Sequence, residues 1–332
     1  MKEVIVSKND AGQRLDRFLC KAFPLMSQGF ICKAVRKKRI KVGGKRTEAN
    51  YKLCENDSIQ LYINDEFLEE KKAASDDDFL TVPTELDIVY EDENILLADK
   101  KPGMVVHEDN DNTVDTLINR IKHYLYDKGE YNPKDEQSFV PSLCNRIDRN
   151  TGGIVIAAKN AESLRILNQK IRDRELVKLY LCVVEGEPPK KADTMTAYLE
   201  KRADENTVIV SDRKTAANRT IKTKYRVVDS CGGFSLVEVD LLTGRTHQIR
   251  AHFAYIGHPL LGDGKYGHNK VSKEWGYKYQ ALYSYKLRFS FTTDGGILSY
   301  LDGREFAVNE VWFKDKYYSD KLIYLNKQKE GH

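Results

Sequence analysis

A short polar segment places one carboxylate between two arginines. It reads Asn145-Arg146-Ile147-Asp148-Arg149-Asn150-Thr151-Gly152-Gly153 and precedes a hydrophobic run that is typical of a strand. Neighbouring guanidinium groups favour the ionised form of Asp148, and they can hold a phosphodiester backbone close to it. Such a carboxylate can act as a nucleophile or a general base. Taken alone, however, the segment is more often a structural turn held by ion pairs.

A second polar segment, Thr243 to Gln248, leads into a stretch that predicts a helix over residues 246–256. Helical spacing would place Thr246 and Arg250 on one face, with His247 and Gln248 on neighbouring faces of the first turn. The positive end of the helix dipole favours an anion at this point. The segment is therefore a candidate site for an anionic substrate group.

A third segment, Lys178-Leu179-Tyr180-Leu181-Cys182, alternates as a β-strand does, so Lys178, Tyr180 and Cys182 should share one face. A tyrosine there can stack on a nucleic-acid base and exchange a proton through its hydroxyl. The commonest role of a tyrosine in a strand is nevertheless packing.

These segments need a scaffold that brings loops together. From Leu80 onward, short hydrophobic runs predict strands, among them 94–98, 153–157 and 234–239, and amphipathic stretches predict helices over 113–126, 161–173 and 246–256. Turns alone separate many of the strands. The pattern favours an α+β domain with a mixed, largely antiparallel sheet.

The first 63 residues form a distinct basic segment, with 14 lysines and arginines against 6 acidic residues. Two amphipathic helices are predicted over 14–23 and 27–39, followed by a strand and a Gly43-Gly44 hairpin turn. The second helix ends in the basic cluster Arg36, Lys37, Lys38 and Arg39. The segment resembles the small S-four-like RNA-binding domain, and the alternative is a solvated basic helix face.

Residues 64–79 carry 7 acids against 2 lysines and show no sustained apolar periodicity, which predicts a flexible linker that lets the small domain swing. The expected organisation is therefore an S-four-like domain over 1–63, an acidic linker over 64–79 and a catalytic domain over 80–325.

Composition narrows the class of protein. No apolar run reaches the length of a membrane span and no signal peptide is legible, so a cytoplasmic protein without a membrane partner is expected. Six scattered cysteines predict no redox pair. His247 and His252 are five residues apart without a nearby acid or cysteine to complete a ligand set, so no metal is expected.

Four motifs in order, RIDRNTGG, KLYLCVVEG, TGRTHQIRAH and GHPLLGD, together resemble the pattern of RluA-type RNA pseudouridine synthases. The resemblance covers nearly the whole chain. It implies that Asp148 is the catalytic aspartate, that Tyr180 stacks on the target uracil, and that Arg250 forms an ion pair with Asp148. It also implies a set of residues facing RNA or substrate, namely Arg146, His107, Arg245, Thr246, His247 and Gln248.

Some positions depart from the family pattern. The family usually has His-Arg-Leu-Asp and Thr-Ser-Gly where this chain has Asn145-Arg146-Ile147-Asp148 and Thr151-Gly152-Gly153. A late Leu-His element becomes Leu282-Tyr283. The first motif, usually Lys-Pro-x-Gly, becomes Lys100-Lys101-Pro102-Gly103. The aspartate and its arginine remain, so the departures concern the substrate and not the chemistry.

The implied reaction converts uridine to pseudouridine without a cofactor, because no atom is gained or lost. The carboxylate would either add covalently or remove a proton from the ribose, and the sequence leaves both routes open. A uridine in structured RNA must be flipped out, with Arg146 the expected filler of its place. The expected partner is RNA, above all large-subunit ribosomal RNA of the 23S type, and a monomer is expected.

Alternative functions are a synthase acting on transfer RNA, a non-catalytic RNA-binding or ribosome-assembly protein, and a hydrolase acting on RNA. The hydrolase would need a metal cluster or a paired acid and base, and neither is legible in the sequence.

Overall fold

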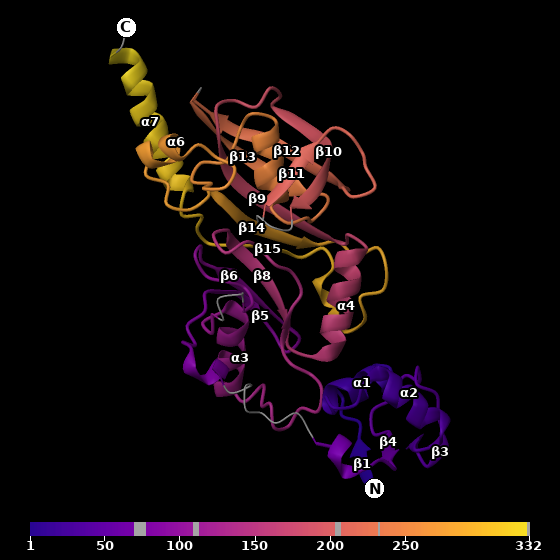
Figure 1. Cartoon of the computed structure of the whole chain (residues 1–332). Coiled ribbons are helices and arrows are strands. Elements are labelled where there is room, and N and C mark those ends of the chain that lie inside the picture. The colour runs from indigo at the N-terminus through magenta and orange to yellow at the C-terminus, as the bar shows by residue number, and fades with distance from the viewer. Residues whose placement is uncertain (70–77, 109–112, 203–206, 232, 331–332) are drawn as a thin grey trace.

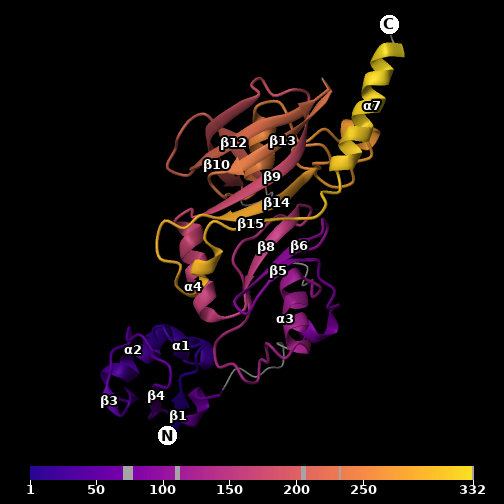
Figure 2. The ribbon, with the colours of Figure 1, turned by 180° about the vertical axis from the view of Figure 1, so that it is seen from behind.

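The computed structural model describes residues 1–69, 78–108, 113–202, 207–231 and 233–330. They form a four-stranded and an eleven-stranded sheet with helices packed against both, an α+β fold. Figures 1 and 2 show the small sheet with its two helices at one end of the molecule and the C-terminal helix α7 (Lys314–Glu330) at the other. None of the helices within the described residues is long and apolar enough to cross a membrane.

The small sheet has the order β1-β4-β2-β3, and its strands are antiparallel. Helices α1 (Leu15–Ala22) and α2 (Gln28–Arg36) pack against it around a core that includes Phe18 and Ile59. The strands are β1 (Lys2–Ile5), β2 (Ile40–Val42), β3 (Lys45–Arg46) and β4 (Ser58–Leu61).

Local sequence signals explain the ends of these elements. The Ser27 hydroxyl accepts the N–H of Phe30 and caps α2, as predicted. The helix ends at Arg36, earlier than the predicted Arg39, because Lys38 adopts a left-handed conformation with φ 60°. Gly43 and Gly44 have φ values of 56° and 74°, which the tight turn between β2 and β3 requires.

The large sheet runs in the order β11-β10-β12-β13-β9-β14-β8-β6-β5, with β15 beside β14 and β7 beside β8. Every pairing in it is antiparallel except that of β14 with β8, so the predicted mixed, largely antiparallel sheet is confirmed. Its strands are β5 (Ile88–Glu91), β6 (Ile95–Lys100), β7 (Ser142–Leu143), β8 (Gly152–Ala158), β9 (Leu176–Glu185), β10 (Ala192–Arg202), β11 (Thr207–Ser211), β12 (Arg219–Ser230), β13 (Phe234–Leu241), β14 (Leu282–Phe289) and β15 (Glu305–Ala307).

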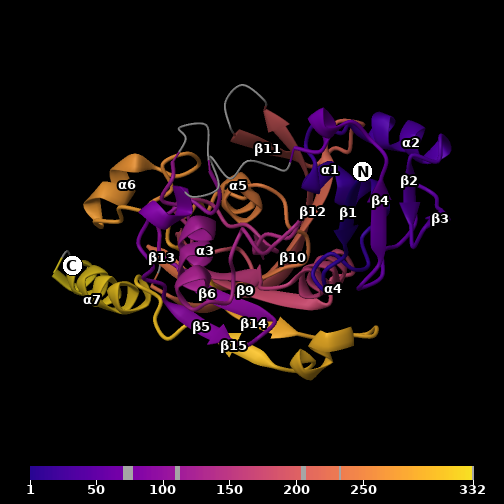
Figure 3. The same cartoon turned by 90° about the horizontal axis from the view of Figure 1, so that it is seen from below.

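Helices cover both faces of the large sheet. Helices α3 (Leu117–Asp127) and α5 (Gln248–Tyr255) pack on one face (Figure 3). Ile147 packs against the cores beneath both helices. Helix α4 (Ala161–Arg172), the 3-10 helix η3 (Gly296–Leu301) and α7 pack on the opposite face. The short helix α6 (Asn269–Glu274) precedes β14. The loop that carries Asp148 therefore lies on the face covered by α3 and α5.

Helix α5 begins at Gln248, two residues later than predicted. His247 has φ 53°, a left-handed conformation that ends the preceding loop and starts the helix. Thr246 consequently lies outside the helix, and the prediction that Thr246 and Arg250 share a helical face is wrong.

The small domain contacts the large one through polar groups. Asn9 donates to Glu136 at 2.6 Å, Gln13 donates to Ser138 at 2.9 Å, and Gln137 donates to the carbonyl of Ile5 at 2.8 Å. The predicted swinging domain is therefore in direct contact with its neighbour in this structure.

The predicted linker is only partly covered, because residues 70–77 lie outside the described residues. On either side of them are two 3-10 helices, η1 (Asp65–Phe67) and η2 (Asp78–Thr81). Phe67 stacks on Phe30, and Phe79 is buried beneath α3, so both described ends are packed. The limits of the three predicted segments stay a prediction.

Two departures from the family pattern lie against each other. A Cβ added to Gly152 would be 2.2 Å from a ring carbon of Tyr283, and the Tyr283 hydroxyl donates to Asp99 at 2.8 Å. The aromatic ring thus occupies the space that a serine at residue 152 would need. The glycine and the tyrosine are a matched pair.

This pairing predicts the effect of restoring the family residues singly and together. Gly152→Ser should destabilise the protein by about 2 kcal/mol, because the ring and the strand must move apart. The double variant Gly152→Ser/Tyr283→His should recover most of that loss. Urea unfolding would measure it, with Gly29→Ser as control, since a Cβ there meets nothing within 4 Å. Additive losses in the double variant would contradict the pairing.

Candidate active site

A cleft of about 1130 Å³ opens between the loop before β8, the face of β9 and the start of α5. Predicted residues from four separate stretches of the sequence line it together. They include His107, Arg146, Asp148, Tyr180, His247 and Arg250. The structure thus gathers side chains that lie up to 143 positions apart in the sequence.

Asp148 and Arg250 form an ion pair in this cleft. Arg250 Nη1 donates to Asp148 Oδ2 at 2.8 Å, and the Asp148 side chain is 26% exposed. Arg250 itself is buried in the first turn of α5. The Asp148 carboxylate also lines the open cleft, so it is held by a cation and accessible to a substrate.

A second carboxylate, Asp263, holds Arg250 from the other side. Arg250 Nε and Nη2 donate to the two oxygens of Asp263 at 2.7 and 2.8 Å, and the N–H groups of Lys265 and Tyr266 donate to Asp263 Oδ1. Burial raises the pKa of Asp263, but the hydrogen bonds and charge of Arg250 outweigh it and lower the pKa overall. This bidentate pair fixes the guanidinium plane that meets Asp148.

Tyr180 lies on β9, between Val239 of β13 and Ser284 of β14. Its side chain lines the cleft together with Lys178, whereas Cys182 is buried in the core below. The prediction that Lys178, Tyr180 and Cys182 lie on one face of a strand is confirmed by β9. Burial raises the pKa of Tyr180 to about 12, so its phenol is protonated at neutral pH.

The residues predicted to face RNA fall into two groups. His107, Arg146, Arg245 and Thr246 are exposed along the cleft. Gln248 also lines the cleft, but it is only 2% exposed and its amide is occupied by Thr243, Thr223 and the backbone of Lys222 and Arg245. Its side chain braces the loop, and its contact with a substrate stays a prediction.

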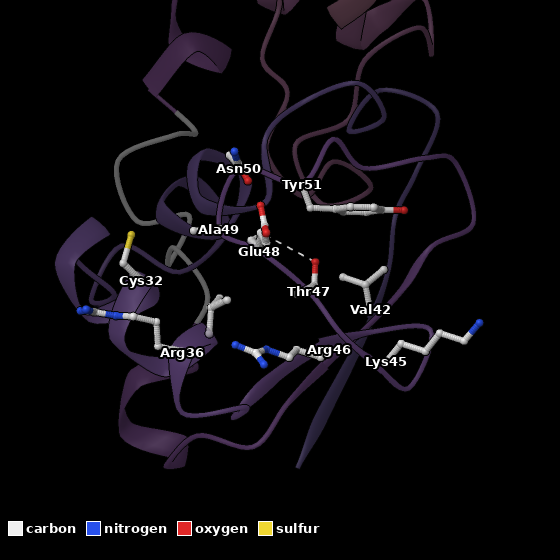
Figure 4. A pocket seen from close by; sticks show the side chains of 11 residues that line it. Cys32, Arg36, Val42, Lys45, Arg46, Thr47, Glu48, Ala49, Asn50 and Tyr51 are labelled. Carbon is white, nitrogen blue, oxygen red and sulfur yellow. Dashed lines mark hydrogen bonds between the residues drawn. The ribbon is translucent and has the colours of Figure 1, made fainter.

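The basic cluster lies apart from the cleft, in the small domain. Lys37, Lys38 and Arg39 are exposed at the end of α2, and Arg36 lines a separate hollow of about 810 Å³. Figure 4 shows Arg36 and Arg46 on one side of this hollow, with Thr47, Glu48 and Asn50 across from them. The cluster can contact a substrate only at a distance from Asp148.

Two contributors to the site were missed from the sequence. The motif GHPLLGD predicts no role for its final residue, Asp263, which holds Arg250 in the structure. Lys100 was noted only as part of a variant motif. Its buried ammonium donates to the carbonyls of Lys101, Met104 and Arg149 at 2.9 to 3.0 Å, which fastens the loop beside Asp148.

Comparisons with known proteins define the class of enzyme. A family model described as RNA pseudouridylate synthase matches residues 94–255. An uncharacterized RNA pseudouridine synthase of Chlorobaculum parvum is 33% identical over 79% of this chain and 77% of its own. Ribosomal large subunit pseudouridine synthase C of Salmonella typhi is 28% identical over 90% of this chain and 91% of its own.

Solved structures agree on the fold. Human RNA Pseudouridylate Synthase Domain Containing 4 matches 70% of this chain and 91% of its own, with a TM-score of 0.55 and 19% identity. The chain belongs to the RNA pseudouridine synthases of the RluA type. It is accordingly an isomerase that acts on RNA.

Proposed function

We propose that this enzyme isomerises uridine in large-subunit ribosomal RNA, with Asp148 as its catalytic carboxylate. The observation that carries the proposal is the position of Asp148, which lines an open cleft and accepts a hydrogen bond from the buried Arg250 at Oδ2. The relatives named ribosomal large subunit pseudouridine synthase C, similar over nine-tenths of the chain, support the choice of RNA.

The reaction breaks the bond from ribose C1′ to uracil N1, turns the base, and forms a bond from C1′ to C5. The proton on C5 then leaves to solvent and N1 regains one, so atoms and electrons balance without a cofactor. Asp148 either adds to the sugar or base or takes a proton from ribose C2′, and both routes need its ionised form.

The target uridine reaches Asp148 by leaving its stack. Tyr180 then stacks on the flipped uracil, and Arg146, exposed at the rim, fills the vacated place. Flipping costs a few kcal/mol, which phosphate contacts offset. His107, Arg245 and Thr246 are the rim residues suited to hold the RNA. The enzyme that we propose works as a monomer in the cytoplasm.

Mapping pseudouridines in cellular RNA tests the proposal. Carbodiimide-dependent reverse-transcription stops would be compared among cells with the intact gene, the deleted gene and Asp148→Asn. Loss of ribosomal sites in both mutants is the expected result. Loss of sites in transfer RNA alone would reassign the substrate, and unchanged sites in every RNA would overturn the proposal.

The basic cluster of the small domain supplies a separate prediction about binding. If Lys37, Lys38 and Arg39 contact phosphates, changing all three to glutamine should flatten the salt dependence of RNA affinity by a slope of about 2 to 3. Titration of RNA binding between low and physiological salt would measure it. Changing Lys314, Lys316 and Lys321 of α7, at the far end of the molecule, is the matched control. If the RNA affinity of both variants had the same salt dependence, the RNA would bind a surface other than the basic cluster.

A further inference from the structure

Tyr266 lies directly behind the candidate active site and contacts two groups through one hydroxyl. The hydroxyl oxygen accepts the N–H of Val208 at 2.9 Å, and it lies 2.9 Å from Nδ1 of His247. The two rings meet edge to face, with centroids 5.6 Å apart and planes at 74°. A phenol has one hydrogen to donate, so the direction of the bond to His247 can be decided by elimination.

The first argument comes from Tyr266 itself. If Nδ1 of His247 carried the hydrogen, the phenol oxygen would accept two hydrogen bonds and its own hydrogen would have no partner among the described residues. If the phenol donates to Nδ1, every group is satisfied. A half-buried hydroxyl that keeps all its hydrogen bonds is the lower-energy arrangement.

The second argument comes from the opposite edge of the imidazole. Nε2 of His247 lies 3.8 Å from Oδ2 of Asp148. A hydrogen on Nε2 would point toward the carboxylate and attract it, whereas a bare lone pair would repel it. Burial lowers the pKa of His247, which favours the neutral ring and makes the choice between tautomers meaningful.

We propose that Tyr266 is a positioning residue: by donating to Nδ1 it fixes the His247 tautomer with hydrogen on Nε2, which turns an N–H toward Asp148 across the 3.8 Å between Nε2 and Oδ2. Arg250 then holds Oδ2 by a hydrogen bond, and the N–H of His247 adds electrostatic attraction to the same oxygen. This inference rests on the proposed function, because it presumes that Asp148 reacts. It assigns to Tyr266 a part in the reaction without contact to RNA.

The tautomer can be observed without any measurement of activity. In full-length protein labelled with ¹⁵N-histidine, two-bond proton–nitrogen correlation spectra distinguish hydrogen on Nε2 from hydrogen on Nδ1, and His247→Gln assigns one of the seven histidines. Wild-type protein should show hydrogen on Nε2 at His247. Tyr266→Phe should give a mixture. Hydrogen on Nδ1 in the wild type, or an unchanged His247 in Tyr266→Phe, overturns the proposal.

Kinetics test the consequence for the reaction. On RNA extracted from cells that lack the gene, Tyr266→Phe should lower the single-turnover rate about tenfold and leave RNA affinity within about twofold, since one hydrogen bond is lost. Tyr279→Phe is the matched control, because its hydroxyl lies near Gly103 and its side chain is outside the cleft lining.

A double-mutant cycle separates positioning from general damage to the fold. His247→Gln should lower the rate on its own. Glutamine has no tautomers for Tyr266 to select, so adding Tyr266→Phe should lower the rate no further. Independent, multiplying losses overturn the proposal. Asp148→Asn tests the proposed function and the spectra of the wild type test the tautomer, so the two ideas fail separately.

Discussion

Asp148→Asn protein should form pseudouridine at least about 10⁴-fold more slowly than wild type while it binds RNA equally well. Asparagine keeps the size of the side chain and an oxygen that can accept from Arg250, but it has neither the charge nor the basicity that either route requires. Release of tritium from RNA labelled at uracil C5 would measure the rate, because that hydrogen leaves when the new bond forms.

The matched control for this variant is Asp193→Asn. Asp193 is also paired with a cation, Lys190 at 2.8 Å, but it lies at the start of β10, outside the cleft lining. Its replacement should leave the rate within about twofold, as surface ion pairs contribute little. Asp148→Asn protein with more than a tenth of the wild-type rate would remove Asp148 from the chemistry.

The scaffold of the site was predictable because it follows from local signals. Short hydrophobic runs located β6, β8 and β13, and alternation of side chains located β9. The Ser27 cap and the glycine turn located α2 and the first hairpin. Each depends only on neighbours in the chain. The same holds for Tyr180, whose face was set by the period of a strand.

What the sequence could not predict depends on contacts between distant segments. The left-handed backbone at His247 is unusual for a residue other than glycine, and it moved Thr246 out of the helix. The hydrogen bonds of Gln248 to Lys222 and Thr223, far away in the sequence, could not be predicted either. Gly152 and Tyr283 both depart from the family pattern and lie 131 positions apart in the sequence. Only the fold shows that they are in contact and that one departure makes room for the other.

The role of Asp263 also depends on a contact that the sequence could not predict. Its ion pair with Arg250 is important for the stability of the site. The Asp263 side chain has no exposed surface, and both oxygens accept from Arg250. Arg250→Met would leave a buried carboxylate without its cation. The expected loss is about 3 to 5 kcal/mol of unfolding free energy, together with loss of activity.

Urea unfolding would measure this effect, with Arg226→Met as control. Arg226 also donates to a carboxylate, Glu238 at 2.8 Å, but its side chain is 63% exposed, so its loss should cost less than about 1 kcal/mol. Adding Asp263→Leu to Arg250→Met removes the stranded charge and should restore most of the stability.

The double variant should nevertheless stay inactive, because Asp148 has lost the donor that orients Oδ2. The double variant should thus regain stability without regaining activity. In the wild type, Asp263 fixes the guanidinium of Arg250, and the fixed guanidinium orients Asp148. If the double variant recovered activity along with stability, Arg250 would serve the fold alone, and Asp148 would need no partner to react.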